Sequence, residues 1–476
     1  MPSVIVWFRR DLRLADNPAL TAALESGHSI VPVYIHALNE EKPWQPGAAS
    51  SAWLHRSLLA LDQDLRQRGS RLILRSGDSL KELETLAEQT QAEAVYWNRL
   101  YEPACIARDT RVKDALKRRG LQVESFNAAL LAEPWTLATG TGGPYRVFTP
   151  FWKNLSQRLG SPSPDRPPER LVAPPERLIS QALADLNLQP APPQPAWDEG
   201  FWEKWQPGEG GAREALDVFV DGAVHGYGQQ RDFPDRIGTS LLSPHLHFGE
   251  ISPRQILARL RSEHWPARTE PDVAHYLREL GWREFSHHLL YHFPQTSENN
   301  LNPRFDDFRW APVNPETLAA WQQGRTGVPI VDAGMRELWR TGWMHNRVRM
   351  IVASFLCKNL RYHWSHGARW FWDTLVDADL ANNTQGWQWT AGTGADAAPY
   401  FRIFNPVTQA QRFDSAGKYV RRWVPELANL PDKALFAPWE LPAATLAELA
   451  PDYPSQPLVD LKASREQALA AYSTSR

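Results

Sequence analysis

Residues 3–127 alternate short apolar runs with amphipathic stretches, and this alternation constrains the fold more than any other feature. Five runs rich in Val, Ile and aromatic residues indicate buried strands at 3–8, 29–36, 71–77, 92–98 and 121–127. Helical patterns lie between these runs, and strands that alternate with helices form a parallel, doubly wound sheet. Ligands of such sheets bind at the carboxyl ends of the strands.

Capping residues mark the ends of the intervening helices. Asn17 suits an N-cap, Pro18 suits the first helical position, and Gly27 lies past the end of that helix. The helical pattern 50–69 also closes on a glycine. A GxGxxG pattern does not follow the first strand, so a Rossmann-like α/β domain is predicted without the standard dinucleotide site.

The composition changes twice along the chain. Residues 160–198 are rich in proline and indicate an extended, semi-rigid connector. From about residue 210 the pattern is helical nearly to the end, and no series of strands is visible. We therefore expect an α/β domain at 1–132, an interdomain linker at 133–205 and an all-α domain at 206–476.

Length and composition exclude several classes of protein. With 476 residues the chain is too long for one small core. No secretion signal or membrane-length apolar run is visible, and Cys105 and Cys357 are the only cysteines. A disulfide scaffold and a Cys-rich metal site are excluded, no metal is expected, and a reducing cytoplasm is the predicted location.

Arginine and tryptophan are unusually frequent. The 52 basic residues comprise 42 Arg and 10 Lys, although the net charge is only −2. Arginine suits phosphate contact in nucleic acids, and a GC-rich genome would also favour its codons. The 22 Trp outnumber the 18 Phe and the 12 Tyr. Most will be core or interface residues, but the excess also suits flat aromatic ligands or electron transfer between indoles.

Two short segments combine residue types that can bind a ligand. Thr239 and Ser240 precede a helical run and suit an anion site, or Ser240 or Ser243 is simply an N-cap. Glu279 and Trp282 are three residues apart and share one helix face, which suits a planar ligand, unless the face is partly exposed and Trp282 packs inward.

A second helical stretch places an amide and a thioether together. Asn346 and Met350 are four residues apart, with Arg347 and Arg349 beside them. These groups could line a pocket that a polyanion reaches, or they form a solvated basic face.

The stretch 380–392, LANNTQGWQWTAG, sets two tryptophans around one glutamine. Residues two apart in a helix point roughly 200° apart, so Trp387 and Trp389 face different surroundings. Asp377 and Asp379 upstream can accept hydrogen bonds, and Asn383 can both donate and accept. Arg402 downstream adds a cation.

Five segments in order resemble the photolyase/cryptochrome family, and most closely its bacterial enzymes that repair cyclobutane pyrimidine dimers. The resemblance runs from residue 3 to about 440. It rests on VIVWFRRDLRLADNPAL, GTSLLSPHLHFGEISPRQ, ELGWREF, GWMHNRVRM and DADLANNTQGWQWTAGTGADAAPYFRIFNP.

The resemblance implies FAD, bent into a U shape, in the carboxy-terminal helical domain. The phosphates and the ribityl-adenine half would contact Tyr227, Thr239, Ser240, Leu242, Ser243 and Tyr276. The ribityl–isoalloxazine part would contact Asp377 and Asp379, and Asn383 would lie beside flavin N5. A neutral amide there suits a flavin kept as the reduced anion, whereas plant-type cryptochromes carry an acid at that position.

The resemblance also implies how DNA and electrons reach the flavin. The flipped-out dimer would contact Glu279, Trp282, Asn346, Met350 and Trp389. Its phosphates would contact Arg231, Arg283, Arg347, Arg349 and Arg402. An electron chain would run through Trp387, Trp364 and Trp310, and a branch would use Trp343, Trp370 and Trp372. The histidine pair of enzymes that repair the (6-4) photoproduct is absent from the helix with Asn346 and Met350.

The implied activity is light-dependent repair of cyclobutane pyrimidine dimers, a carbon–carbon lyase reaction. Photoexcited reduced FAD would pass an electron to the flipped-out dimer in UV-damaged DNA. Members of the family also hold an antenna, methenyltetrahydrofolate or 8-hydroxy-5-deazaflavin. Pro103-Ala104-Cys105 replaces the Asn-Glu pair of one folate pattern. The identity of any antenna therefore stays open, and we expect a monomer without membrane contact.

Two other functions compete with repair. A signalling cryptochrome would bind flavin and respond to light, but Asn383, the intact dimer-contact set and the short tail after about 440 argue against it. A structural nucleic-acid-binding protein would explain the Trp and Arg content. It would not explain the paired acids or the Gly-Thr-Ser segment.

Overall fold

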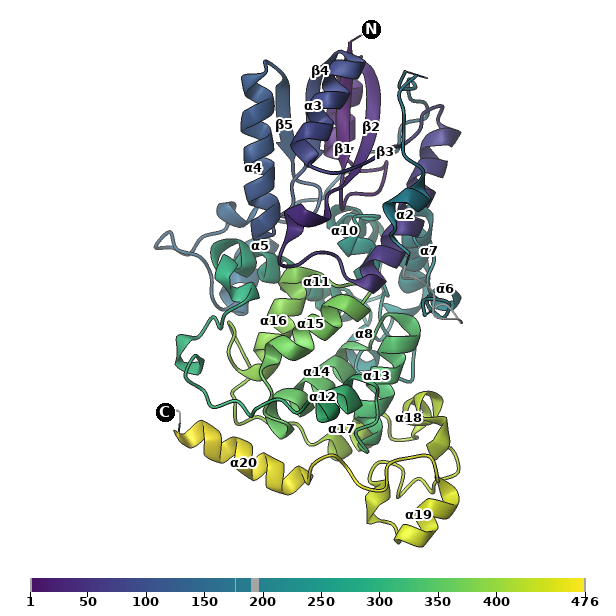
Figure 1. Cartoon of the computed structure of the whole chain (residues 1–476), viewed down its shortest axis with the longest axis vertical. Coiled ribbons are helices and arrows are strands. Elements are labelled where there is room, and N and C mark those ends of the chain that lie inside the picture. The colour runs from purple at the N-terminus through teal and green to yellow at the C-terminus, as the bar shows by residue number, and fades with distance from the viewer. Residues whose placement is uncertain (1, 176, 190–196, 475–476) are drawn as a thin grey trace. The chain divides into compact units, whose positions relative to one another are not determined.

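A computed structural model describes residues 2–175, 177–189 and 197–474 of the chain (Figure 1). The chain forms two compact units. Unit 1 comprises Met1–His225 and Ser240–Pro294, and unit 2 comprises Gly226–Thr239 and Gln295–Arg476. These units cut across the three segments expected from composition, because helices of the proposed linker and of the helical segment pack together in unit 1. The segment boundaries 1–132, 133–205 and 206–476 stay a prediction about the sequence.

Unit 1 contains the predicted sheet. Its strands are β1 (Ser3–Phe8), β2 (Ser29–His36), β3 (Ile73–Ser76), β4 (Ala92–Asn98) and β5 (Gln122–Phe126). All neighbours are parallel, and the order is β3-β2-β1-β4-β5. This order winds outward on both sides from β1, so the doubly wound α/β prediction is confirmed.

Unit 1 also contains helices, and the first of them has the predicted N-cap. They are α1 (Pro18–Glu25), α2 (Ala48–Gln67), α3 (Ser79–Thr90), α4 (Pro103–Arg118), α5 (Phe148–Arg158), α6 (Phe201–Lys204), α7 (Glu209–Val218), α9 (Ser243–His247), α10 (Pro253–Ser262) and α11 (Glu270–His292). The Asn17 side chain accepts the Leu20 N–H at 3.2 Å, which caps α1 as expected. Gly27 has φ +70°, a left-handed conformation that favours glycine.

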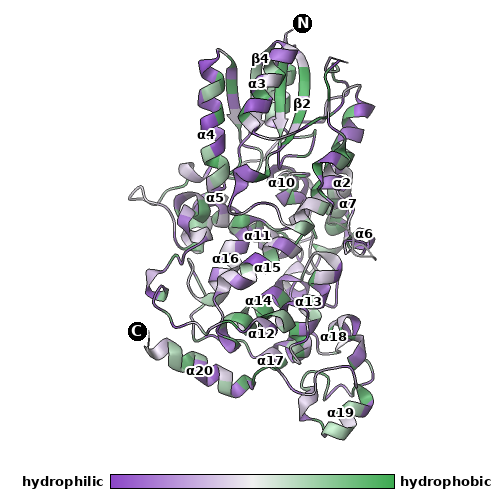
Figure 2. Ribbon diagram, viewed as in Figure 1, coloured by the Kyte–Doolittle hydropathy of each residue, from purple (hydrophilic) through white to green (hydrophobic). Residues whose placement is uncertain are grey.

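The core of the sheet domain lies between one face of the sheet and two helices. Buried residues of all five strands pack on Leu83 and Leu86 of α3 and on Val112 and Leu116 of α4. Figure 2 shows β2 as hydrophobic and much of the outer surface of α4 as hydrophilic. Both faces of a parallel sheet must be covered, which explains why these strands are almost continuously apolar.

The carboxylate of Glu250 connects α2, the start of α7 and α9 in unit 1. Glu250 is fully buried and accepts hydrogen bonds from Trp53 Nε1 at 3.0 Å and Ser57 Oγ at 2.6 Å, both on α2. It also accepts the Gly208 N–H at 2.8 Å and contacts His245 Nδ1 on α9. Because buried donors must find acceptors, this residue fixes α2, the start of α7 and α9 to one another.

Among its described residues, unit 2 has helices joined by loops and no strands. Its helices are α8 (Tyr227–Gln230), α12 (Pro315–Gln322), α13 (Pro329–Thr341), α14 (Asn346–Ser354), α15 (Trp364–Thr374), α16 (Leu380–Ala391), α17 (Pro406–Phe413), α18 (Lys418–Trp423), α19 (Ala443–Leu449) and α20 (Leu461–Thr474). A π-helical turn, Phe355–Asn359, extends α14. Within the described ranges of the whole chain, no helix is long and apolar enough to cross a membrane.

We expect the variant Glu250→Ala to destabilise the protein strongly. The change leaves three buried N–H or O–H donors without an acceptor, and each such donor costs about 1–3 kcal/mol. The apparent melting temperature should fall by about 5 °C or more, measured by circular dichroism during heating. Glu93→Ala, at a side chain that is 64% exposed, is the matched control and should melt like the wild type. Equal melting of the two variants would contradict the role of Glu250.

Candidate functional site

Three of the predicted flavin-contacting residues lie together in unit 1. The Tyr276 hydroxyl on α11 donates a hydrogen bond to Ser240 Oγ at 3.0 Å, and the Leu242 N–H contacts the same oxygen at 3.4 Å. Burial raises the pKa of Tyr276 to about 12, so the phenol stays a neutral donor. The structure thus links residues that are 36 positions apart in the sequence.

The serines of this segment do not cap the next helix. Leu242 precedes α9, and no side chain makes a capping hydrogen bond there. Ser243 is the exposed first residue of α9. The alternative interpretation of Ser240 or Ser243 as a simple N-cap therefore fails, and the hydroxyl groups keep the capacity to bind a ligand.

Glu279 and Trp282 share one side of α11, as their spacing predicts. The Trp282 indole stacks on Phe148 of α5 with ring centroids 3.6 Å apart and an interplanar angle of 8°. Glu279 lies 3.6 Å from His275, one turn earlier on the same helix. Stacking on a buried phenylalanine fixes the plane of the indole, which a flat ligand requires. The same contact agrees with the alternative of a partly exposed helix with Trp282 packed inward, so a ligand-binding role for this pair stays a prediction.

Asn346 and Met350 lie on α14 of unit 2. Asn346 is exposed and begins the helix, and Met350 is half-buried one turn later. His345 caps α14 by accepting the Arg347 N–H at 3.2 Å. Burial lowers the pKa of His345 to about 3, so its imidazole stays neutral and keeps that lone pair.

The arginines assigned to DNA differ in how they are engaged. Arg347 pairs with Asp232 at 2.9 Å, and Arg349 holds both carboxylate oxygens of Asp377 at 3.1 and 2.8 Å. Arg283 in unit 1 donates to the Ala129 carbonyl at 2.8 Å. The Arg231 guanidinium lies 5.3 Å from the centre of the Tyr227 ring, and Arg402 is exposed.

Two polar side chains at the amino-terminal end of α16 have fixed orientations. Asp379 caps this helix by accepting the Asn382 N–H at 2.8 Å. Asn383 donates from Nδ2 to the Ala368 carbonyl of α15 at 2.9 Å, which turns its own carbonyl oxygen away from α15.

Thr239 follows Gly238, where an added Cβ would lie 2.5 Å from the Gln230 carbonyl oxygen.

The two tryptophans of 380–392 face different surroundings, as a helix requires. Trp387 is 2% exposed, whereas Trp389 is half-buried. Trp387 packs edge-on against Phe371 at 4.9 Å and Trp321 at 6.3 Å between ring centroids. It also presses on Gly367 of α15, where an added Cβ would lie 2.0 Å from the indole.

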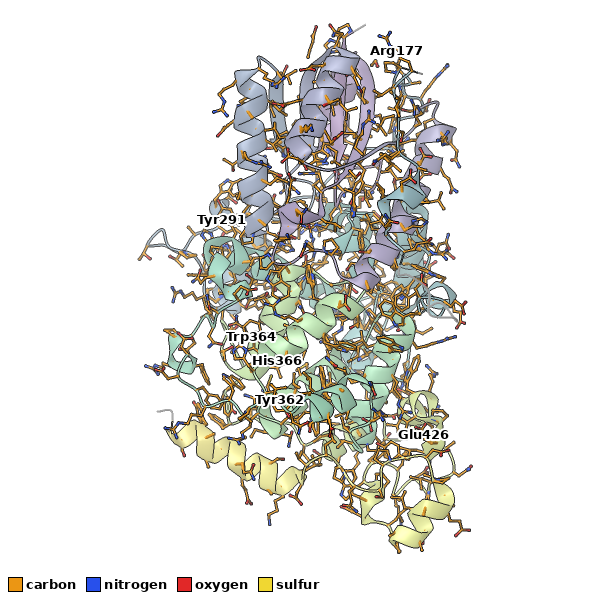
Figure 3. All side chains as sticks on the ribbon, viewed as in Figure 1. Arg177, Tyr291, Tyr362, Trp364, His366 and Glu426 are labelled. Atoms are coloured by element: carbon orange, nitrogen blue, oxygen red, sulfur yellow. The ribbon has the colours of Figure 1, made fainter. Side chains whose placement is uncertain are left out.

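Trp364 and Trp310 flank one histidine. The His363 ring lies 5.2 Å from Trp364 and 5.2 Å from Trp310, between ring centroids. Trp364 is fully buried and donates its indole N–H to Asn300 Oδ1 at 2.9 Å. Figure 3 labels Trp364 with its neighbours Tyr362 and His366 in unit 2. Trp370 stacks on the half-exposed Trp339 at 5.9 Å, a partner that the sequence did not indicate.

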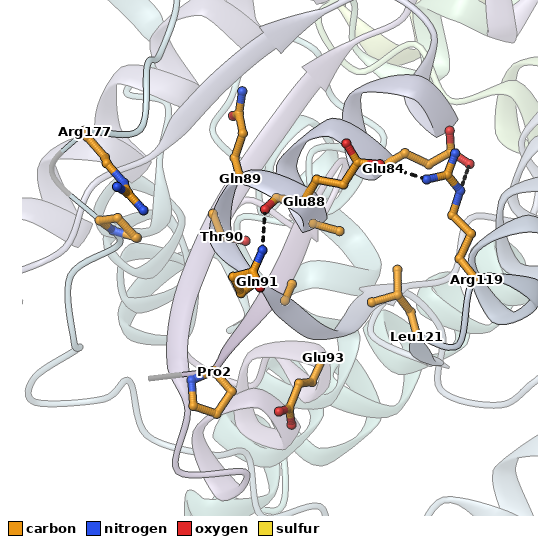
Figure 4. A pocket seen from close by; sticks show the side chains of 13 residues that line it. Pro2, Glu84, Glu88, Gln89, Thr90, Gln91, Glu93, Arg119, Leu121 and Arg177 are labelled. Atoms are coloured by element: carbon orange, nitrogen blue, oxygen red, sulfur yellow. Dashed lines mark hydrogen bonds and ion pairs between the residues drawn. The ribbon is translucent and has the colours of Figure 1, made fainter.

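A cavity of about 800 Å³ lies elsewhere, at the amino ends of the strands of unit 1 (Figure 4). Glu84, Glu88 and Arg119 line it, and both glutamates pair with the arginine. None of the predicted site residues lines this cavity. Among the described residues, no group of three His, Cys, Asp or Glu side chains could hold a metal ion.

Comparisons with known proteins identify the family. Residues 4–169 match the family described as DNA photolyase, and residues 276–474 match the FAD binding domain of DNA photolyase. The chain is 49% identical to deoxyribodipyrimidine photo-lyase of Agrobacterium fabrum, over 99% of this chain and 97% of that protein. The chain belongs to the photolyase/cryptochrome family.

Other members of the family show the same full-length similarity. The crystal structure of a bacterial class III photolyase from Agrobacterium tumefaciens superposes with a TM-score of 0.94 at 48% identity, over 100% of this chain and 98% of that one. Cryptochrome-1 of Arabidopsis thaliana is 40% identical over 98% of this chain and 70% of its own length. The Rossmann-like and helical arrangement predicted from the sequence is that of a photolyase.

Each unit contains predicted flavin-contacting residues, and their chemistry fits this cofactor. In unit 1, the Ser240 and Tyr276 hydroxyls form a connected polar group that can bind phosphate or ribityl oxygens. In unit 2, Asp377 is held by Arg349 and Asn383 is held by Ala368. These side chains are oriented by hydrogen bonds within the protein, as a cofactor contact needs.

We expect Gly367→Ala to displace Trp387. The new methyl group would overlap the indole, and overpacking of a core costs about 1–3 kcal/mol. The melting temperature should fall, and a crystal structure of the variant should show a shifted Trp387. Gly386→Ala on α16 is the matched control, because an added Cβ there meets nothing within 4 Å and alanine favours a helix. If both variants melt like the wild type, the packing argument is wrong.

Proposed function

We propose that the protein is a light-dependent deoxyribodipyrimidine photo-lyase that splits cyclobutane pyrimidine dimers in DNA. The observation that carries the proposal is the oriented neutral amide of Asn383, in a chain that is similar over its full length to such an enzyme. One N–H of the amide donates to the Ala368 carbonyl, and this bond orients the amide, whose oxygen can act as an acceptor. An acceptor suits the N–H group that a reduced flavin carries at N5.

We assign nine residues to contact with FAD. Tyr227, Thr239, Ser240, Leu242, Ser243 and Tyr276 would hold the phosphates and the ribityl-adenine half, and Asp377, Asp379 and Asn383 the ribityl–isoalloxazine part. When bound in its reduced form and excited by light, FAD would supply the electron that opens the cyclobutane ring and would take it back afterwards. Arg349 neutralises Asp377 and fixes its carboxylate plane, so this arginine is better suited to the flavin side than to a DNA phosphate.

The dimer would be held by a rigid indole and by polar groups. Trp282, fixed by Phe148, offers a flat surface for an extruded pyrimidine, and Trp389 offers a second indole. Glu279 and Asn346 can bond the pyrimidine edges, and charge that develops on the dimer is stabilised by such prepositioned groups. The Met350 thioether contributes a polarisable apolar contact.

Phosphates of the damaged strand would meet the remaining arginines. Arg402 is exposed, and Arg231 and Arg347 are half-buried on unit 2. Contacts to phosphate position the DNA without reading its sequence, which suits an enzyme that must act wherever a dimer forms. The interaction of Arg347 with Asp232 can orient its guanidinium before DNA binds.

Trp387, Trp364 and Trp310 are proposed to conduct an electron from the protein surface to the flavin. Trp387 lies on Gly367, one turn along α15 from Trp364, and His363 links Trp364 to Trp310. Trp310 is half-buried, so the chain ends where water is accessible. Such a route activates the flavin by reduction and takes no part in splitting the dimer.

We propose that an antenna does not bind in the folate pose that uses an Asn-Glu pair. Pro103 is the first residue of α4, and Cys105 is buried, with a pKa raised by that burial. Methenyltetrahydrofolate in another pose, 8-hydroxy-5-deazaflavin or no antenna are the possible states, and a spectrum of the gently purified protein distinguishes them. We also propose a monomer in the cytoplasm.

A blue-light-signalling cryptochrome without repair activity is the second candidate, favoured by the similarity to Cryptochrome-1 of Arabidopsis thaliana. The neutral Asn383 and the complete set of dimer-contact residues favour repair. Binding of flavin does not separate the two candidates, but a repair assay does.

We expect the reduced protein to repair UV-irradiated oligothymidine only under blue or near-UV light. Recovery of thymine absorbance measures the reaction, and a dark incubation with the same protein is the control. Glu279→Gln should bind FAD like the wild type and repair more slowly, because it removes the charge beside the dimer. Repair in darkness, or no repair by protein that holds reduced flavin, would contradict a photolyase and leave the cryptochrome.

We expect Trp387→Phe to separate activation from repair. Phenylalanine is much harder to oxidise, so photoreduction of bound flavin should slow by more than about tenfold, an energetic change above 1.4 kcal/mol. Repair by chemically reduced variant should match the wild type. Trp135→Phe, at a 47% exposed indole of unit 1, should change neither rate. Loss of repair after chemical reduction would refute this division of roles.

A further inference from the structure

The indole N–H of Trp364 donates to a neutral amide. It donates to Asn300 Oδ1 at 2.9 Å, and Asn300 Nδ2 donates to Asp306 Oδ1 at 2.9 Å. The orientation of the amide is unambiguous, because the indole can only donate and the carboxylate can only accept. A neutral amide therefore separates the buried indole from an exposed carboxylate.

Gln388 holds Asn300 in place from both sides. The buried Gln388 amide accepts the Leu301 N–H at 3.0 Å and donates to the Asn299 carbonyl at 2.9 Å. It also donates to the Thr296 carbonyl at 2.7 Å. The residues before and after Asn300 are thus bound by one side chain of α16, which lies between Trp387 and Trp389 in the sequence.

The second polar neighbour of Trp364 offers no base to it. The Nδ1 atom of His363 accepts the Ser365 N–H at 3.2 Å and lies 2.8 Å from Ser365 Oγ. In the neutral ring the hydrogen is then on Nε2. Burial lowers the pKa of His363 to about 4, so the ring stays neutral and its one lone pair is already used.

We propose that Asn300 is a positioning residue that keeps the indole proton on Trp364 while an electron passes through it. The inference rests on the electron chain of the proposed function. Trp364 gives one electron to oxidised Trp387, which has reduced the photoexcited flavin. The amide oxygen of Asn300 is far too weak a base to take the N–H proton. The Trp364 cation radical is therefore refilled by an electron from Trp310.

The positive charge ends on Trp310. One electron leaves Trp310, Trp364 returns to its neutral state with its proton in place, and one positive charge reaches the half-buried end of the chain. There the Trp310 N–H proton can pass to water, which prevents return of the electron. A carboxylate at position 300 would instead remove the proton from Trp364 and stop the charge inside the protein.

The exchange variant Asn300→Asp with Asp306→Asn tests this directly. It keeps the net charge and the hydrogen-bonded pair but places the carboxylate against the indole. Asn300→Asp alone would set two carboxylates against each other and favour a protonated one. We expect transient absorption to show a neutral Trp364 radical in the exchange variant and a cation radical in the wild type. Trp310→Phe should slow stable photoreduction at least about tenfold in the wild type but less than about twofold in the exchange variant.

Two single variants are the controls. Asp306→Asn keeps the amide at position 300, and Asn299→Asp adds a charge one residue away, where the side chain is exposed. Both should keep the cation radical and the dependence on Trp310. A cation radical at Trp364 in the exchange variant would overturn the proposal.

A measurement without flavin checks the hydrogen bond itself. In protein labelled with ¹⁵N-tryptophan, the Trp364 indole N–H should exchange with D₂O at least about tenfold faster in Asn300→Leu than in the wild type. Unchanged exchange would contradict the assigned bond. Failure of the proposed electron chain is distinguishable, because Trp364→Phe would then leave wild-type photoreduction unaffected.

Discussion

The buried amide of Gln388 is the interaction on which the arrangement of unit 2 depends. A buried amide must satisfy both its donor and its acceptor, and this one does so on the backbone of residues 296–301, with a longer contact to the Thr393 hydroxyl at 3.4 Å. That requirement fixes the rotation of α16 about its axis. Trp387 then turns inward onto Gly367 and Trp389 stays half-exposed. The glutamine between the two tryptophans thus decides which indole faces the core and where Asn300 lies.

The features that could be predicted from the sequence are those set by local periodicity. The five strands form within two residues of the predicted bounds, because a buried parallel strand needs a continuous apolar run and little else. The Asn17 cap follows from the three residues after it. The opposite directions of Trp387 and Trp389 follow from the geometry of one helix.

The features that could not be predicted depend on partners far away in the sequence. Trp364 and Asn300 are 64 positions apart, and Trp53 and Glu250 are 197 positions apart. Asn300 lies in a polar loop without periodicity, so its sequence context does not reveal an indole partner. Arg349 resembles any other cation in a basic stretch until Asp377 is placed opposite it. The composition gives the number of charged residues, but only the fold shows which of them form ion pairs with one another.

Two buried indoles of unit 2 donate to neutral acceptors. Trp364 donates to an amide, and the neighbouring Trp321 donates to the Val352 carbonyl at 3.3 Å. Asn383 on α16 donates to the Ala368 carbonyl of α15. The carboxylate of Asp377 is matched to a guanidinium instead of an indole. Neutral acceptors hold an aromatic ring rigidly without offering it a base, so electrons can move between fixed rings while protons stay where they are. For the proposed electron chain, we infer that this separation matters more than the number of tryptophans, because it lets the charge move on from Trp364.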